Sequence, residues 1–448
     1  MPSLALLIIG IIPLIYVAIL IRRYGIPEAL SLRPVGVVFI WIGYHLSPWL
    51  YFATGQTWDH FLLVPEHINT ALGFSTISSL FFLIGYSYIF NHRLADVRGD
   101  RMEFESINVS PLLVALLVGA LLLVVIVLRG GITELWSAST VDWGRQFEER
   151  HGAAKIIQVL GVARMPLTLA ATVTSGFLIL GSTRSKLSYW VGLFSLGIAV
   201  LSSLSVFSRA AGFPLILFAF MALRMKGKGA IWYALLLVAV AVFLGSVGLN
   251  YRHEFYPGIG NFLVAAGNAL VRSMESSGGW APSAAQFVNP LDATAPFTRI
   301  VELGVRPGDD PLLLALMFFW NLNPLPSEFV PLFEIGESLT DALGTWGNTG
   351  LTTPALAEIY RVFGYLGSSA LFLIGMLCGW CERRTILRPS VLSSLNSILF
   401  FAAFPLSLHS ATRAMTRPFV YGIAMVLVAR FRWKTQFGRS STWHGTAR

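Results

Sequence analysis

The chain has 448 residues, of which 55% are hydrophobic and 12% charged, and its mean hydropathy is +0.68. Soluble domains carry about 25% charged residues, so half that share together with repeated long apolar runs excludes an ordinary soluble protein. The net charge of +9 is explained better by basic residues on one side of a membrane than by nucleic-acid binding, and the two cysteines exclude a disulfide framework. We expect an all-α polytopic membrane protein.

The hydropathy pattern predicts eleven transmembrane helices. No Lys or Arg precedes the first span, residues 4–21, whereas Arg22 and Arg23 follow it. Because cytoplasmic loops carry the excess of basic residues, this places the N-terminus outside, and an odd number of spans places the C-terminus in the cytoplasm. The other ten spans are expected at residues 34–54, 68–91, 110–128, 156–181, 187–207, 210–223, 229–249, 364–381, 390–409 and 418–429.

These spans divide the chain into four parts: eight helices with short loops (1–249), one long extracytoplasmic loop (250–363), three further helices (364–429) and a basic cytoplasmic tail (430–448). Inside the loop, apolar residues at helical spacing over 261–277 predict an amphipathic helix at the membrane surface. Residues 312–320 are apolar but too few to span, so we expect an interfacial or re-entrant segment.

Three short motifs favour structure over chemistry. Gly375 and Gly379 form a GxxxG that predicts close helix packing. Cys378 and Cys381 lack the further ligands that a zinc site needs. The Asp309–Asp310 pair, between a glycine and a proline, predicts a turn rather than a metal site.

By these span limits no Asp or Glu lies inside the membrane. Proton- and ion-coupled transporters need an ionisable group at membrane depth, so this absence argues against a transporter. His45 and Arg164 are the exceptions within the spans. A single intramembrane histidine is either a hydrogen-bonded packing residue or a functional group.

Arg209 precedes an unusually short span. Residues 210–223 make only about 21 Å of helix, against a hydrocarbon core of about 30 Å. The Ser208–Arg209 turn is therefore expected in a recess below the outer surface, near Arg252. A charge held there needs an anionic partner, which is either a ligand phosphate or a carboxylate of the loop.

Other candidates lie at the outer ends of spans. Arg252, His253 and Glu254 place a cation, a possible base and a carboxylate on adjacent residues, although a solvated helix end is the alternative. Glu358 and Arg361 share one helical face, where they either serve a substrate or form a local ion pair. Arginine suits a phosphate partner because its planar fork donates two parallel hydrogen bonds. The remaining predicted outer arginines are Arg145, Arg413 and Arg417.

Residues 348–367, NTGLTTPALAEIYRVFGYLG, resemble the closing signature of the Wzy-type O-antigen polymerases, also called oligosaccharide repeat unit polymerases. A second, weaker similarity is the SRAAG turn at residues 208–212, and the chain departs from the family in its expected outer N-terminus and span count. The signature positions are Thr353, Pro354, Glu358, Tyr360, Phe363, Gly364, Tyr365 and Gly367.

The resemblance implies an enzyme of a bacterial inner membrane. It would transfer a growing glycan from undecaprenyl pyrophosphate onto a new lipid-linked repeat unit at the outer face, making O-antigen, capsule or exopolysaccharide. We expect Arg209, Arg252, Arg145, Tyr360, Arg361, Arg413 and Arg417 to bind the diphosphate or glycan, and Glu254, His253 or Glu358 to act as base.

An activated diphosphate donor makes a metal optional, because arginines can stabilise the developing negative charge. We therefore expect no metal and no cofactor. The expected partners are the lipid-linked oligosaccharides, the bilayer, and a chain-length regulator and flippase, without nucleic acid. The alternatives are an O-antigen ligase-like glycosyltransferase and a lipid-linked glycan flippase or exporter.

Overall fold

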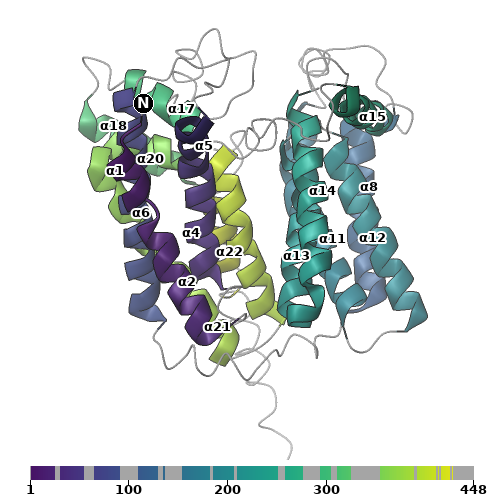
Figure 1. Ribbon diagram of the computed structural model, residues 1–448. Coiled ribbons are helices and arrows are strands. Elements are labelled where there is room, and N and C mark those ends of the chain that lie inside the picture. The colour runs from purple at the N-terminus through teal and green to yellow at the C-terminus, as the bar shows by residue number, and fades with distance from the viewer. Residues whose placement is uncertain are drawn as a thin grey trace, which may run out of the picture.

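The structure is a computed structural model. It describes residues 2–25, 31–54, 65–90, 109–129, 135–136, 154–181, 185–205, 209–250, 258–275, 293–303, 310–323, 354–387, 391–409, 412, 415–423 and 426. Every regular element in these ranges is helical (Figure 1), which confirms the predicted all-α class.

Seven helices within the described ranges are long and apolar enough to cross a membrane, so the chain is a multi-span membrane protein. The predicted total of eleven spans stays a prediction, because the other apolar helices are shorter. The seven are Leu4–Tyr24, Leu32–Ala53, Glu66–Ile89, Pro111–Leu128, Lys186–Leu204, Ile231–Gly248 and Ala355–Leu387.

The helices form two groups in Figure 1, which we call the terminal half and the middle half. The terminal half consists of α1 Leu4–Ile9, α2 Ile12–Tyr24, α4 Leu32–Trp41, the π-helix η1 Ile42–Leu46, α5 Ser47–Thr54, α6 Pro65–Ile89, α17 Thr294–Leu303, α18 Pro311–Asn321, α20 Ala355–Phe363, the 3₁₀ turn η6 Gly364–Ser369, α21 Ala370–Leu387 and α22 Val391–His409. The middle half consists of α8 Pro111–Arg129, α11 Ala154–Leu180, α12 Lys186–Leu204, η3 Arg209–Gly212, α13 Phe213–Lys226, η4 Gly227–Ala230, α14 Ile231–Asn250 and α15 Ile259–Glu275.

The two ends of the bundle differ in character. One end, the loop end, carries α15, α17, α18 and α20 (Figure 1). At the other end, the basic end, α2, α13 and α21 finish with basic residues in their last turns. These residues are Arg22, Arg23, Arg224, Lys226 and Arg384. The basic last turns of these three helices therefore lie at one end of the bundle, while the predicted orientation in the membrane stays a prediction.

Helices α6 and α21 pack backbone against backbone in the terminal half. A Cβ added to Gly85 would overlap the carbonyl oxygen of Phe372, and one added to Gly379 would lie 2.7 Å from the carbonyl oxygen of Tyr86. Gly375 also faces the α6 backbone so closely that a side chain would overlap it. The prediction from the GxxxG spacing is confirmed, because only glycines allow this approach.

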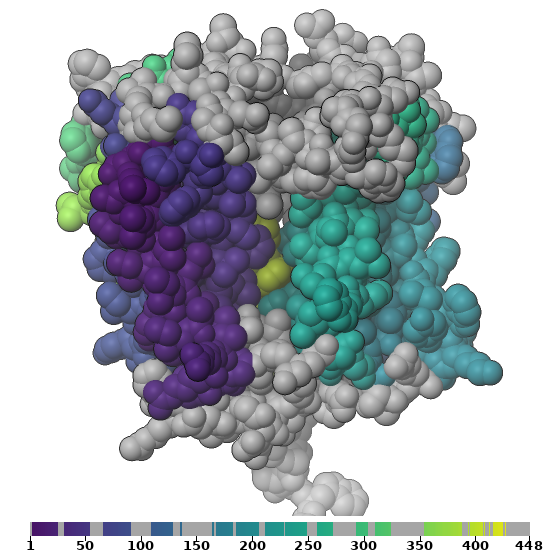
Figure 2. Space-filling view, in the orientation of Figure 1, coloured from purple at the N-terminus to yellow at the C-terminus, as the bar shows by residue number. Residues whose placement is uncertain are grey.

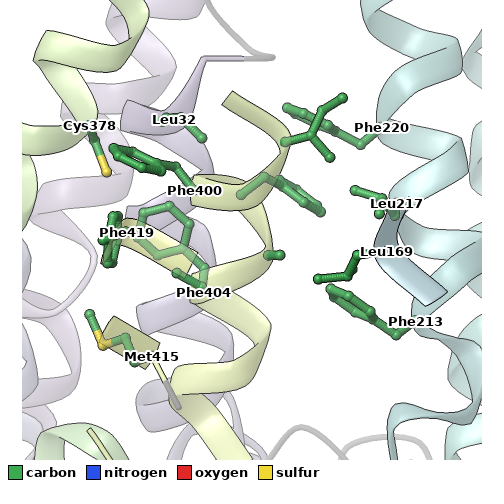
Figure 3. Close-up of a cluster of buried hydrophobic side chains, with 14 of the residues drawn as sticks. Leu32, Leu169, Phe213, Leu217, Phe220, Cys378, Phe400, Phe404, Met415 and Phe419 are labelled. Atoms are coloured by element: carbon green, nitrogen blue, oxygen red, sulfur yellow. The ribbon is translucent and has the colours of Figure 1, made fainter. Parts of the chain in front are cut away.

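The two halves meet where α13 packs on α22. The ring of Phe220 on α13 stacks on Phe401 of α22 with centroids 4.0 Å apart, and Phe401 also meets Phe39 of α4 edge-on at 6.0 Å. Figure 3 shows apolar side chains of the middle half, among them Leu217 and Phe213, facing α22. Figure 2 shows the surface hollowed between the halves, with α22 visible at the floor.

One sequence-based statement is wrong. We expected the span at residues 364–381 to end before Glu382, which would leave the spans free of carboxylates. Instead α21 continues to Leu387, and Glu382 is fully buried. Its carboxylate pairs with Arg224 of the other half at 3.2 Å, which explains why a charge is retained inside the bundle.

The predicted loop helices are present as α15 and α18. In α15 Phe262 and Ala265 are buried, whereas Leu270 is exposed. Phe262 belongs to the same buried apolar cluster as Leu204 at the end of α12. Asp310 caps α18 by accepting the amide of Leu312 at 2.9 Å. Asp309 lies outside the described residues, so the predicted turn stays a prediction.

Candidate functional site

The long loop is anchored to the bundle at the π-helix η1. The carbonyl oxygen of Gly43 in η1 accepts a hydrogen bond from the backbone amide of Ala293 at 2.8 Å. The hydroxyl of Thr294 donates to the same oxygen at 3.3 Å. A π-turn interrupts the regular helix and is frequent at functional sites. Here it offers a backbone acceptor to the first residues of α17, so this part of the loop is fixed to the membrane helices.

An aromatic cluster continues this anchor toward α20. Phe297 of α17 meets Tyr44 of η1 at 5.9 Å and Phe74 of α6 at 5.7 Å, both edge-on. Tyr360 of α20 lies 5.2 Å from Phe74 and 5.5 Å from Phe297, and Tyr365 closes the cluster at 5.6 Å from Tyr360. Each such pair contributes about 0.5–1.5 kcal/mol beyond burial. The structure thus gives Tyr360 a packing role, and its predicted contact with a sugar stays a prediction.

Helix α20 carries Glu358, the one predicted base that the described ranges contain. Glu358 is only 6% exposed. Its Oε2 accepts the backbone amide of Thr412 at 2.7 Å, and the Thr412 hydroxyl donates to the carbonyl of Ala355 at 3.2 Å. Hydrogen bonds to a carboxylate are about twice as strong as neutral ones. The carboxylate is therefore held rigidly, and it holds the segment that follows α22.

Each glycine of the FGYLG motif is required by the local structure, Gly364 by its backbone conformation and Gly367 by a close contact. Gly364 ends α20 with φ +55°, a left-handed conformation that favours glycine, and its amide bonds to the carbonyl of Tyr360. Gly367 lies against α20, where an added Cβ would be 2.5 Å from Cγ2 of Ile359. The motif therefore forms the tight turn η6 that joins α20 to α21. This turn fixes the position of Glu358 along the axis of the bundle relative to α21.

Two predicted arginines belong to the same region. Arg361 lies one turn after Glu358 on α20, and Arg417 lies in the helical segment 415–423 that follows Thr412. Both side chains are half-buried, and the buried Nε of Arg417 has no hydrogen-bond partner in the described part of the chain. The Glu358–Thr412 contact thus links the segments that carry a carboxylate and two cations.

His45 is buried behind the aromatic cluster. Its Nε2 lies 2.9 Å from the hydroxyl of Ser75 and 3.5 Å from that of Thr76 on α6. The ring fits against Gly10, where any side chain would overlap Nδ1. These contacts agree with the packing interpretation of His45, although Nδ1 has no hydrogen-bond partner among the described residues.

The Arg209 turn lies deep in the middle half. Gly212 of η3 touches the backbone of Ala241, near the midpoint of α14. Ala241 lies about 14 Å of helix below Asn250, the end of α14. The depth of the turn below a membrane surface stays a prediction. Ala211 packs with Phe262, so α15 covers part of the turn from the loop end.

The remaining predicted residues are not placed. Arg145, Arg252, His253, Glu254 and Arg413 lie outside the described residues, as does the side chain of Arg209. Of the ten predicted site residues, Glu358, Tyr360 and Arg361 lie together on α20 at the loop end, and Arg417 lies in the segment that follows the Thr412 contact.

The described residues contain no group of three or more His, Cys, Asp or Glu side chains that could hold a metal ion. The sequence-based interpretation missed Gly43, Phe297 and Thr412, which position the site. A π-turn leaves no sequence signal that we could have used, and backbone donors such as the Thr412 amide occur at nearly every residue.

No family model, curated protein or solved structure matches the chain.

Proposed function

We infer that this chain is a membrane glycosyltransferase. In this proposal it polymerises undecaprenyl-pyrophosphate-linked repeat units at the outer face of a bacterial inner membrane. The observation that carries the proposal is the fixed, buried Glu358 at the loop end, joined through Thr412 to the segment with Arg417 and followed on its own helix by Arg361.

The chemistry requires three things. A general base must accept the proton of the acceptor hydroxyl, and Glu358 is a carboxylate held in one position. Cations must stabilise the leaving diphosphate, and half-buried arginines do so more strongly than exposed ones because less water screens them. The lipid chains need an apolar route, and the membrane helices supply it.

A second candidate is a flippase or exporter of lipid-linked glycans. The absence of carboxylates from the spans argued against transport, and Glu382 removes that argument. A buried ion pair between two half-bundles is also a feature that transporters use. The two candidates differ in the product that is lost when the gene is deleted.

A deletion strain tests the proposal through its surface glycans. Electrophoresis should show loss of the polymer ladder while the acceptor still carries one repeat unit, because units are still made, exported and attached. Complementation with the intact gene should restore the ladder. If every unit disappears from the acceptor, the chain is a ligase or a flippase and the polymerase proposal is wrong.

The proposal also requires the loop end to face outward, which reporter fusions test. One reason for this expectation is that the predicted short loops are alternately rich and poor in Lys and Arg along the sequence. The other is that the basic last turns of α2, α13 and α21 lie at the opposite end of the bundle. If an alkaline phosphatase fused after Gly308 is inactive and a cytoplasmic reporter fused at the same position is active, Gly308 lies in the cytoplasm and the premise is removed. We expect a cytoplasmic signal after Arg23, Arg98, Lys226 and Arg384, and an external signal near Gln56, Gln146 and Gly308.

A further inference from the structure

A single buried carboxylate joins four helices at the basic end. Glu382 of α21 pairs with Arg224 of α13 at 3.2 Å. The other carboxylate oxygen, Oε1, accepts the backbone amide of Leu32 at the start of α4 at 3.1 Å and lies 3.5 Å from the hydroxyl of Ser397 on α22. Arg224 also donates to Ser397. We call these four residues the basic-end clasp.

The clasp connects the two halves, because Arg224 belongs to the middle half and the other three residues to the terminal half. Glu382 and Ser397 are fully buried, and the Arg224 side chain is 9% exposed. The Arg224 guanidinium also lies 5.4 Å from the ring of Phe220. Buried ion pairs with several hydrogen bonds hold a defined geometry, since each displaced partner leaves an unpaired charge or donor.

Further toward the loop end, the contact between α13 and α22 has a different character. Phe220 stacks on Phe401, and the labelled side chains of the middle half beyond it, Leu217 and Phe213, are apolar (Figure 3). Apolar contact has no preferred direction, so such faces can slide or part with less loss of specific bonds. The surface is also hollowed between the halves, with α22 at its floor (Figure 2).

We propose that the basic-end clasp is a pivot, and that the two halves move apart and together at the loop end around it. This movement would open and close the hollow between the halves from the loop end. The inference concerns the mechanics of the bundle and does not depend on the proposed glycosyltransferase activity.

Pulsed electron–electron resonance on the full chain in lipid nanodiscs tests the pivot. Cys378 and Cys381, both buried and neither in a disulfide, are first replaced by alanine. One spin-label pair joins Leu387 of α21 and Trp232 of α14 at the basic end, and the other joins Leu366 of η6 and Leu263 of α15 at the loop end. All four labelled positions are exposed. We expect a narrow distance distribution for the basic-end pair and a broader one for the loop-end pair.

The variant Glu382→Gln keeps an oxygen for the Leu32 amide but removes the charge that holds Arg224. We expect it to broaden the basic-end distribution. The matched control, Glu302→Gln, removes the carboxylate of the Arg299–Glu302 ion pair on α17, whose side chains are 34% and 41% exposed. It should leave the basic-end distribution unchanged.

Arg224→Lys, which keeps the charge without the planar fork, provides a second variant if Glu382→Gln does not accumulate, and it should also broaden the basic-end distribution. The proposal is overturned if the basic-end distribution is the broader of the two in the unmodified clasp. It is also overturned if the clasp variant that accumulates leaves the basic-end distribution unchanged.

Discussion

Replacement of Glu358 by glutamine is expected to lower the rate of polymerisation by about 100-fold or more, because general base catalysis contributes about 10²–10⁴ in rate. Glutamine has the size of glutamate and can still accept the Thr412 amide through its carbonyl oxygen. It cannot accept a proton from a sugar hydroxyl. The measurement is turnover of lipid-linked units by purified protein, with the amount of folded protein determined by gel filtration.

Two further variants separate catalysis from structure. Glu358→Ala removes the acceptor of the buried Thr412 amide, so it should also lower the free energy of unfolding by about 1–3 kcal/mol. Thr412→Val keeps that amide but removes the hydroxyl bond to Ala355, which should cost about 0.5–1.5 kcal/mol with little change in turnover. If Glu358→Gln retains full turnover, Glu358 only holds the segment after α22 and the base lies elsewhere.

Replacement of Arg209 by alanine is expected to reduce turnover at least about tenfold while the protein still inserts and accumulates. The η3 turn lies near the middle of α14, where a cation is poorly solvated and a phosphate partner is strongly bound. A charge-assisted hydrogen bond contributes roughly 1.5–3 kcal/mol, and each 1.4 kcal/mol is about tenfold in rate if the bond acts in the transition state.

Arg209→Lys serves as the comparison. A point charge cannot make the paired contact of a guanidinium, so lysine should recover only part of the loss. A full polymer ladder from an alanine variant made at normal levels would show that Arg209 does not serve the reaction. An alanine variant that fails to accumulate would show that Arg209 forms a structural ion pair.

The hydrophobic helices could be predicted from sequence because the bilayer requires spanning segments of similar length whose backbone hydrogen bonds are satisfied within a helix. The predicted spans over 110–128 and 229–249 agree with α8 and α14 within two residues at each end. The GxxxG contact was also predictable, since two glycines four residues apart on one helix face allow a neighbouring backbone to approach, as Gly375 and Gly379 do with α6. In these cases the residues that make up the sequence pattern are the same residues that form the helix or the close contact.

The site could be predicted only in part. Glu358 and Arg361 were found because their spacing places them on one helical face. The aromatic cluster around Tyr360 was not predicted, because Phe74 and Phe297 come from helices far from α20 in the sequence. The buried Glu382 was missed because its helix extends past the continuous apolar run that ends at Cys381, and its partner Arg224 comes from the other half.

The contact between α6 and α21 has a consequence for how the protein is made. About 280 residues separate the two helices, so at 5–20 residues per second the ribosome needs roughly 15–60 s to produce the second after the first. During this time the face of α6 around Gly85, which packs on α21 in the folded protein, must still face lipid or the insertion machinery. The contact between α6 and α21 therefore forms late in translation, and truncation before residue 370 would leave α6 without the helix on which its glycine face packs.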